Sequence, residues 1–247
     1  MKTRMLAAIA VCAFGFGSAN AAEIVHDNFN YADGALVPNG GWASHSGNLG
    51  TLLVSSGQAV IQMNGSASED ANLAFAPVAG MIYYGIDFSV TADSVSGGDY
   101  EYFAHFKDSG FGFAGRLDVV EALGGGDYSV GIASDESTAD TIWPTDLVFG
   151  TTYRAVVRYD QAQNIAELWI DATLPGDQSI LGEDRADPGD TIESFALRQS
   201  FSSSAEVVVT DNLCVGTTFA DVVTPCTDTV AVEEKTWSGV KSLYDVQ

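Results

Sequence analysis

The sequence is poor in positive charge. Of its 247 residues, 10 are Lys or Arg and 33 are Asp or Glu, so the formal net charge is −23. A surface of this kind repels the phosphates of nucleic acids and of anionic membranes. We therefore expect no nucleic acid among its partners, and solubility in salty surroundings explains the acidity more simply than cation binding does.

Long apolar runs are also scarce. The run Met5 to Gly17 follows two basic residues and leads to Ala19-Asn20-Ala21, a small-x-small site that a signal peptidase accepts. It is shorter than the roughly 20 apolar residues that a membrane-spanning helix needs. We expect residues 1–21 to be a signal peptide, and the mature protein to be secreted, extracellular or periplasmic, without membrane insertion.

Cysteine is nearly absent. Three occur, and Cys12 lies within the expected signal peptide, which leaves Cys214 and Cys226. An even pair in an exported chain predicts a disulfide. This bond would clip the C-terminal tail to the last strand and contribute roughly 3 kcal/mol of stability.

Helical periodicity is missing from most of the chain, and alternation with a period of two takes its place. Ile82, Tyr84, Ile86, Phe88 and Val90 share one face of such a run, as expected of a half-buried strand. Similar runs follow, separated by turn residues rich in Gly, Asp and Asn; they are Tyr100–Lys107, Arg116–Val120, Tyr128–Ala133, Tyr153–Tyr159, Ile165–Ile170, Phe195–Gln199 and Glu206–Val209. Many antiparallel strands with polar turns predict an all-β sandwich of two packed sheets.

Helical spacing returns at the C-terminal end. Between residues 235 and 246, Trp237, Val240, Leu243 and Tyr244 fall on one face of a short amphipathic segment. Such a segment is too short to be stable alone, so it must dock on its own sandwich, on a second copy of the chain or on an envelope partner. We divide the mature chain into a domain at 22–222 and a tail at 223–247.

Three segments resemble bacterial secreted proteins with concanavalin-like or laminin-G-like jelly rolls. They are Asp27–Trp42, Tyr153–Asp171 and Asp211–Val222, which in that family are the opening segment, a central hairpin with a Trp-bearing strand, and the closing strand. The resemblance implies an antiparallel two-sheet jelly roll of lectin-like type. This fold carries lectins, adhesion modules, glycosidases, lyases and structural domains, so it does not name an activity.

A glycosidase on this fold would need two carboxylates on one strand. The run Arg116 to Glu121 resembles the Glu-x-Asp-x-x-Glu strand of family-sixteen glucanases, with Asp118 and Glu121 in place. Arg116 stands at the position of the nucleophile, and a guanidinium cannot attack an anomeric carbon. The chain has three histidines, His26, His45 and His105, and none lies beside a nucleophile signature such as Gly-x-Ser-x-Gly.

A polysaccharide lyase remains an alternative enzyme. It would need a Tyr or His base near an Arg that neutralises a uronate carboxylate, and His105, Arg116, Arg154 and Arg158 could share one face of a sheet. Solvent-facing charges on strands are the simpler explanation of the same residues.

Binding is the interpretation that we favour. Trp169 alternates away from the apolar face of its strand beside Arg154, so its ring could stack on a sugar, unless the loop Leu174–Asp190 covers it. If the first and last strands pair, Asp27 and Asp211 approach one another and could hold a structural Ca²⁺. Strand-end turns explain both aspartates equally well.

The sequence therefore predicts a non-catalytic, secreted module that binds a glycan or a cell-surface protein. Its predicted ligand-binding residues are Trp169, Arg154, Arg116 and His105. A carbohydrate-active enzyme is the alternative, and a structural or assembly subunit of the cell surface, with self-association through the tail, is a further one.

Overall fold

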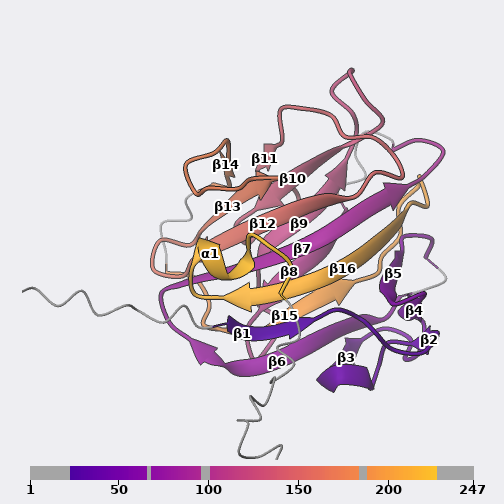
Figure 1. Cartoon of the computed structure of the whole chain (residues 1–247), viewed down its shortest axis with the longest axis horizontal. Helices are drawn as coiled ribbons and strands as arrows, with labels where there is room; N and C mark the ends of the chain where they lie inside the picture. The colour runs from indigo at the N-terminus through magenta and orange to yellow at the C-terminus, as the bar shows by residue number, and fades with distance from the viewer. Residues whose placement is uncertain (1–22, 66–67, 96–100, 184–187, 227–247) are drawn as a thin grey trace, which may run out of the picture.

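The protein is described by a computed structural model over residues 23–65, 68–95, 101–183 and 188–226. The expected signal peptide and the tail helix predicted at 235–246 lie outside these residues. Figure 1 shows strands throughout, with one short helix near the C-terminal end of the described chain. No helix among the described residues is long and apolar enough to cross a membrane.

The larger sheet has nine antiparallel strands. Its order is β14-β13-β12-β7-β16-β5-β4-β2, and β1 pairs with the C-terminal half of β16. The strands are β1 (Glu23–Asp27), β2 (Gly34–Ala35), β4 (Leu53–Ser55), β5 (Gln58–Gln62), β7 (Met81–Thr91), β12 (Tyr153–Asp160), β13 (Ile165–Ile170), β14 (Ile180–Leu181) and β16 (Val207–Gly216).

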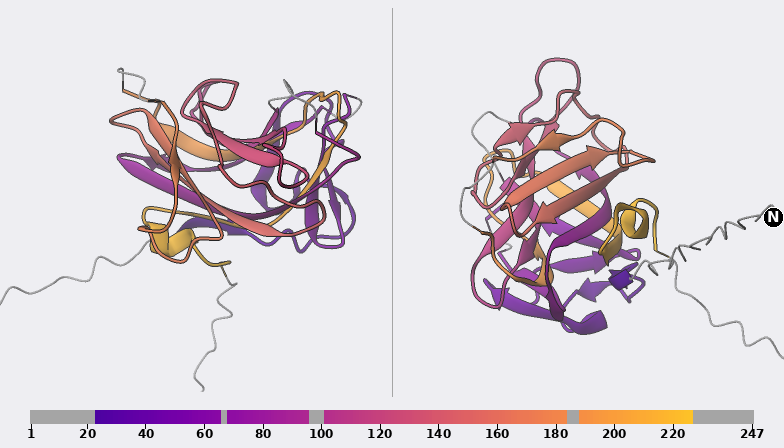
Figure 2. Two further views of the ribbon diagram at one scale, coloured as in Figure 1. Left: turned by 90° about the horizontal axis from the view of Figure 1, so that it is seen from above. Right: turned by 90° about the vertical axis from the view of Figure 1, so that its left-hand side faces the viewer.

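The smaller sheet has seven antiparallel strands in the order β11-β10-β9-β8-β15-β6-β3. They are β3 (Trp42–Ser46), β6 (Asp70–Val78), β8 (Glu101–Lys107), β9 (Phe113–Val120), β10 (Ser129–Ala133), β11 (Thr141–Ile142) and β15 (Ile192–Arg198). The two sheets form the stacked layers seen in Figure 2. The predicted all-β, two-sheet antiparallel sandwich is confirmed.

The hydrophobic core lies between the two layers, where the period-two alternation places it. Ile82, Tyr84, Ile86, Phe88 and Val90 on β7 are all buried in one cluster. Phe103, Phe106 and Phe195 face them from the seven-stranded sheet, and the Tyr84 ring contacts Phe106 and Phe195 at centroid distances of 5.0 Å. Burial of these faces supplies most of the stabilisation. The opposite, outer faces of the two sheets are left to carry polar groups.

A second, smaller apolar cluster lies outside the nine-stranded sheet. It contains Val156 and Trp169 from β12 and β13, and Phe219 and Val222 from the helix α1 (Phe219–Val222). The helix begins with a capping box in which Thr218 and Asp221 satisfy each other's backbone donors. A short 3₁₀ turn, η1 (Asn39–Gly41), leads into β3. The chain after β16 thus folds back over the outer face of this sheet, and the packed segment continues past residue 222 to Cys226.

Candidate functional site

The four predicted ligand-binding residues do not share one surface. His105 on β8 and Arg116 on β9 belong to the seven-stranded sheet, whereas Arg154 on β12 and Trp169 on β13 belong to the nine-stranded sheet. Because the two sheets are stacked with their outer faces on opposite sides of the molecule, these pairs point in opposite directions. A lyase site that combines His105 and Arg116 with Arg154 or Arg158 is therefore not formed.

Trp169 is not a surface for a sugar ring. Its side chain alternates away from the core, as predicted, but only 3% of it is exposed. Phe219 of α1 packs on it edge to face, with ring centroids 5.2 Å apart. Of the two alternatives for Trp169, an exposed ring and a covered one, the structure shows the covered one, and Phe219 and Val222 of α1 pack in the same cluster as the ring.

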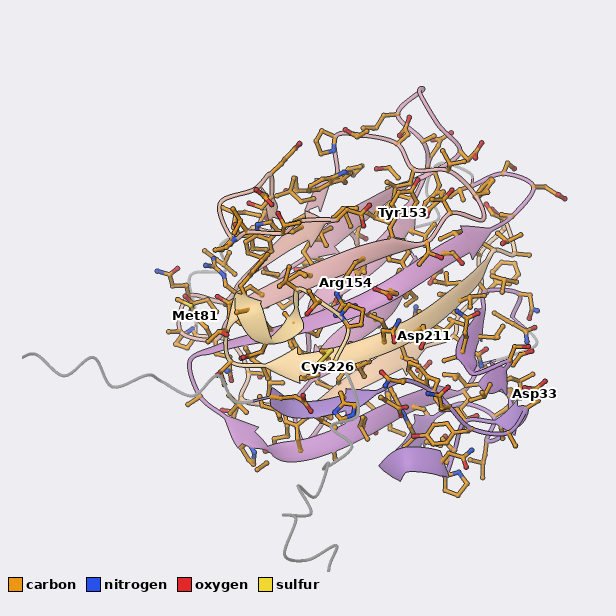
Figure 3. The ribbon with its side chains drawn as sticks, in the orientation of Figure 1. Asp33, Met81, Tyr153, Arg154, Asp211 and Cys226 are labelled. Carbon is orange, nitrogen blue, oxygen red and sulfur yellow. A yellow bond between two sulfur atoms is a disulfide. The ribbon has the colours of Figure 1, made fainter. Side chains whose placement is uncertain are left out.

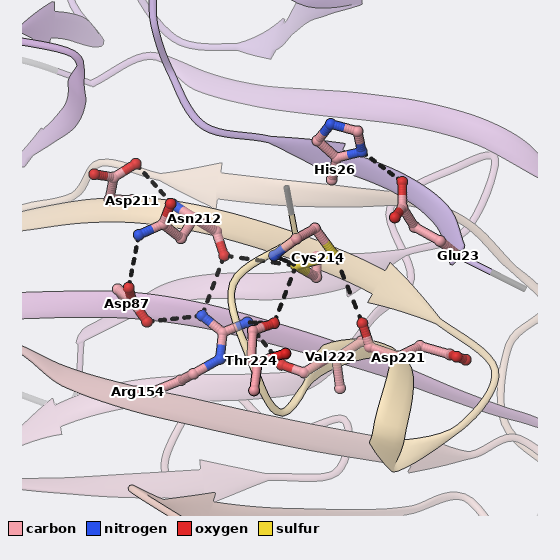
Figure 4. The surroundings of a disulfide bond; sticks show 11 residues. Glu23, His26, Asp87, Arg154, Asp211, Asn212, Cys214, Asp221, Val222 and Thr224 are labelled. Atoms are coloured by element: carbon pink, nitrogen blue, oxygen red, sulfur yellow. Dashed lines mark hydrogen bonds and ion pairs between the residues drawn. A yellow bond between two sulfur atoms is a disulfide. The ribbon is translucent and has the colours of Figure 1, made fainter. Parts of the chain in front are cut away.

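Arg154 is engaged within the protein. Its Nη1 donates to Asp87 Oδ1 at 2.7 Å and to the carbonyl of Asn212 at 3.2 Å. Its Nη2 donates to the carbonyls of Val222 and Thr224 at 2.6 and 3.1 Å. Figure 3 places Arg154 near Cys226 on this face, and Figure 4 shows the guanidinium surrounded by these oxygen atoms. With its donors used in this way, Arg154 anchors the C-terminal segment.

The predicted disulfide is present. Cys214 on β16 and Cys226 are bonded, with their Cα atoms 5.7 Å apart. Figure 4 shows the bond beside the Arg154 guanidinium. The bond and the guanidinium hold the same returning segment, so the outer face of the nine-stranded sheet is closed at this point.

The predicted metal ligands Asp27 and Asp211 lie on paired strands, since β1 pairs with β16 and Asp27 is opposite Leu213, two residues from Asp211. The Asp27 carboxylate already accepts three hydrogen bonds, from the backbone of Phe29, the hydroxyl of Tyr31 and the indole of Trp42, at 2.6 to 2.8 Å. The described residues hold no group of three or more His, Cys, Asp or Glu that could bind a metal. These two aspartates fit a calcium ion poorly, because the first is committed to protein donors.

The glucanase-like strand does not form a pair of reacting carboxylates. Arg116 and Asp118 lie on the same face of β9, but Glu121 follows the end of the strand and is exposed. Asp118 is completely buried, and burial raises its pKa well above 3.8 even though Arg116 is nearby. With Arg116 at the nucleophile position and Asp118 completely buried, the strand does not present the two carboxylates that retaining glycosidases use.

Polar groups instead gather on the outer face of the seven-stranded sheet, around the Tyr102 ring. Arg116 lies over this ring with its guanidinium carbon 4.8 Å from the centroid, and Arg198 lies over it at 4.2 Å. His105, on the same strand as Tyr102, meets the ring edge to face at 5.3 Å. The three neighbouring strands β9, β8 and β15 supply these residues, because antiparallel pairing brings their outward positions side by side. We call Tyr102, His105, Arg116, Asp118 and Arg198 the outer-face cluster.

Several buried polar atoms of this cluster have no hydrogen-bond partner among the described residues. They are His105 Nε2, Arg116 Nε and both carboxyl oxygens of Asp118. Buried polar atoms in folded proteins are nearly always bonded to protein, water or a ligand. The cluster therefore has unused hydrogen-bonding capacity, in contrast to the fully bonded guanidinium of Arg154.

Burial sets the protonation states of the cluster. It lowers the pKa of His105 to about 3, and the nearby Arg116 adds to this effect, while a hydrogen bond from Nδ1 to the Phe106 carbonyl opposes it. It also raises the pKa of Tyr102. At neutral pH the face thus presents a neutral imidazole next to positively charged arginines, and burial raises the pKa of Asp118 well above its ordinary value.

A hollow of about 220 Å³ opens on the same face next to the cluster. Its lining residues are Asn72, Ala74, Lys107, Asp108, Ser109, Glu193 and Ser194. The hollow adjoins His105. Lys107 lies two residues further along β8, and Ala196 on β15 pairs with His105 on one side and with Asn72 of β6 on the other. Amide, ammonium, carboxylate and hydroxyl groups thus converge on one depression.

Aromatic side chains from the β8–β9 hairpin border this hollow. Phe111 is 75% exposed, and the Lys107 ammonium lies 5.8 Å from its ring centroid. Phe113 is half-buried and lies across the cluster, with its ring centroid 4.5 Å from that of His105 and 6.0 Å from that of His45. Burial lowers the pKa of His45 as well.

The sequence analysis identified His105 and Arg116 but missed Asn72, Lys107 and Phe111. The sequence did contain a signal for Lys107 and Phe111. Phe111 is an apolar residue in a Gly-rich turn, and Lys107, four residues before it, is one of the few cations of an acidic chain. Asn72 carries no such signal, because it occupies an ordinary outward position on β6.

Comparison with solved structures places the sandwich among known folds. It is similar to a sialidase, with a TM-score of 0.52 and 14% identity over 82% of this chain and 19% of that chain. It is also similar to the carbohydrate recognition domain of Emp47p, with a TM-score of 0.51 and 10% identity over 82% of this chain and 99% of that one. The fold is a concanavalin-like jelly roll. At these identities the likeness concerns the fold alone.

The jelly roll spans about a fifth of the length of the sialidase, 19% of that chain, and nearly the whole of the Emp47p domain. No protein-family model matches the sequence, and no curated protein sequence matches it.

Proposed function

We propose that this jelly roll is a non-catalytic module that binds a glycan on the outer face of its seven-stranded sheet. The observation that carries the proposal is the set of unbonded polar atoms on His105, Arg116 and Asp118, which lies next to a hollow lined by polar side chains. Sugar sites combine convergent polar groups with aromatic faces, and this face offers both.

The exposed ring of Phe111 is the stacking surface of the proposed site. It stands at the rim of the hollow beside Lys107. A pyranose packed on this ring would turn its hydroxyl groups toward Asn72, Glu193 and Ser194 in the hollow. Exposed apolar side chains on monomers usually occur singly and need no explanation, so the adjoining polar hollow is what distinguishes Phe111.

The Emp47p domain supports the proposal by analogy, since it shares the fold over nearly its full length and is described as a carbohydrate recognition domain. The disulfide supports a place outside the reducing cytosol, in keeping with secretion. The absence of turnover is part of the proposal, and it is supported by β9, where Arg116 stands at the nucleophile position and Asp118 is completely buried.

Binding to a panel of soluble polysaccharides tests the proposal, with the full chain and affinity electrophoresis as the assay. We expect retention by at least one member, and we expect Phe111→Ala and Asn72→Ala to weaken it about tenfold or more, as the loss of a stacked ring or a hydrogen-bond partner does. Leu174→Ala is the matched control for Phe111, because Leu174 is 62% exposed in a loop next to the nine-stranded sheet. Equal retention of Phe111→Ala and the control would place the site elsewhere.

Calcium binding is a separate proposal with its own test. Asp27 and Asp211 are the residues that would contribute, although the protein donors on Asp27 compete with an ion. An ion that binds only the folded state at a hundred times its dissociation constant adds about 2.7 kcal/mol of stability. Thermal unfolding with Ca²⁺ and with EDTA should then differ by several degrees, and identical curves would refute a calcium site.

A further inference from the structure

Positive charge is concentrated on the proposed binding face. The described residues contain five Lys or Arg side chains in a chain of net charge −23. Two of them, Arg154 and Arg158, lie on the nine-stranded sheet and form ion pairs with Asp87 and Glu167. The other three are Lys107, Arg116 and Arg198, all on the outer face of the seven-stranded sheet.

Arg116 differs from the other described arginines because it forms no ion pair with a described carboxylate. It is 9% exposed, and no described carboxylate lies within ion-pair distance of it. The rings of Tyr102 and Phe113 hold its guanidinium in place at 4.8 and 5.5 Å, while its Nε lacks an acceptor. A buried guanidinium is costly unless an anion and hydrogen-bond acceptors compensate it.

Its neighbours compensate it only in part. Burial lowers the pKa of Arg116, and the nearby Asp118 and Asp135 oppose this, but neither forms an ion pair with it. Asp118, two residues along the strand, is fully buried with neither oxygen hydrogen-bonded, and burial raises its pKa well above the ordinary value. Glu101 is paired with Arg198 at 2.9 Å.

We propose that the glycan bound on this face carries an anionic group, a carboxylate or a sulfate, and that the Arg116 guanidinium receives it. Arg198, which also lies over the Tyr102 ring and is paired with Glu101, adds positive charge nearby. This inference rests on the proposed function. The planar guanidinium, already aligned by two aromatic rings, suits the two oxygens of such a group.

The overall charge of the protein makes this proposal specific. A polyanion is repelled by a molecule with a net charge of −23, so its retention cannot result from general electrostatic attraction. Binding of an anionic glycan would require a local site that overcomes the repulsion. The affinity should fall as salt is raised if ion pairing dominates.

The test compares matched polysaccharides by titration calorimetry on the full chain. Polygalacturonate is paired with its methyl ester, and dextran sulfate with dextran. We expect one anionic member to bind at least tenfold more tightly than its neutral counterpart; the preferred pair identifies the group as carboxylate or sulfate. Arg116→Gln should abolish the preference, and Arg158→Gln, the matched control on the opposite sheet, should retain it. If Arg116→Gln does not fold, the half-buried Arg198→Gln replaces it and should reduce the preference.

Two outcomes would overturn the inference in distinguishable ways. Equal affinity for the anionic and neutral members, unchanged in Arg116→Gln, would leave glycan binding in place and refute the anionic group. Absence of binding to every polysaccharide, in this test and in the broader panel, would refute the proposed function and the inference together.

Discussion

Arg154 on β12 donates two hydrogen bonds to the backbone carbonyl of Val222, a residue 68 positions further along the chain, at 2.6 and 3.1 Å. This carbonyl lies at the end of α1, the helix that covers Trp169. One side chain therefore ties the central hairpin to the returning C-terminal segment. The predictions for this part of the molecule concern stability rather than binding.

Replacement of Arg154 by Met should destabilise the fold by about 3 kcal/mol or more, because Asp87 is left partly buried without its cation. Arg158→Met is the control, since Arg158 is more exposed than Arg154, 23% against 11%, and pairs with Glu167 on the neighbouring strand, so we expect a smaller loss. Urea denaturation of the two variants checks the difference. Equal losses would show that Arg154 does not anchor the segment.

Loss of the disulfide should have an effect of similar size. The bond joins residues 12 positions apart, and closing a loop of that length contributes roughly 3 kcal/mol. Chemical unfolding with and without a reductant measures this contribution. The double variant Cys214→Ala/Cys226→Ala should be about as stable as the reduced wild type, less stable than the oxidised wild type, and insensitive to the reductant; a wild type that is itself insensitive would contradict the prediction.

Asp118 should make stability fall as the pH rises. Its pKa is raised in the folded state by burial, so above pH 3.8 the unfolded chain releases this proton while the folded chain keeps it. Each pH unit in that window costs about 1.4 kcal/mol of stability, until the pH reaches the folded-state pKa. Asp118→Asn cannot release a proton, so it removes this loss of stability with rising pH. We therefore expect the variant to gain stability relative to the wild type between pH 4 and pH 7, measured as the difference of urea unfolding curves.

His105 should have the opposite effect and make the stability of the fold rise as the pH rises. Its pKa is lowered to about 3 in the folded state, so its contribution to stability is complete above pH 6.5 and is lost as the pH falls toward 3. The direct measurement is an NMR titration of the imidazole resonances. We expect the His105 signals to stay constant from pH 8 to pH 5; a midpoint near 6.5 would mean that the ring is solvated.

Much of the fold follows from local patterns. The alternation in β7 predicts which side chains face the core, because a strand turns successive residues to opposite sides. The polar turn Asp160–Asn164 correctly predicts the hairpin between β12 and β13. The pair Cys214 and Cys226 predicts the disulfide by elimination. These features depend on neighbours in the sequence or on residue counts, so no knowledge of the packing is needed.

The candidate site depends on tertiary structure in a way that these patterns do not contain. Arg154 and Arg116 both occupy outward positions on amphipathic strands and are alike in sequence. Only the packing distinguishes them, since α1 and the segment after it supply carbonyl acceptors to Arg154, whereas Arg116 lies against Phe113 without an ion pair among the described residues. By itself the sequence determined that two sheets form and which residues face outward. Which outward arginine is tied to the returning chain was decided by the path of the chain across one sheet, a contact between residues too distant in sequence for any local pattern to record.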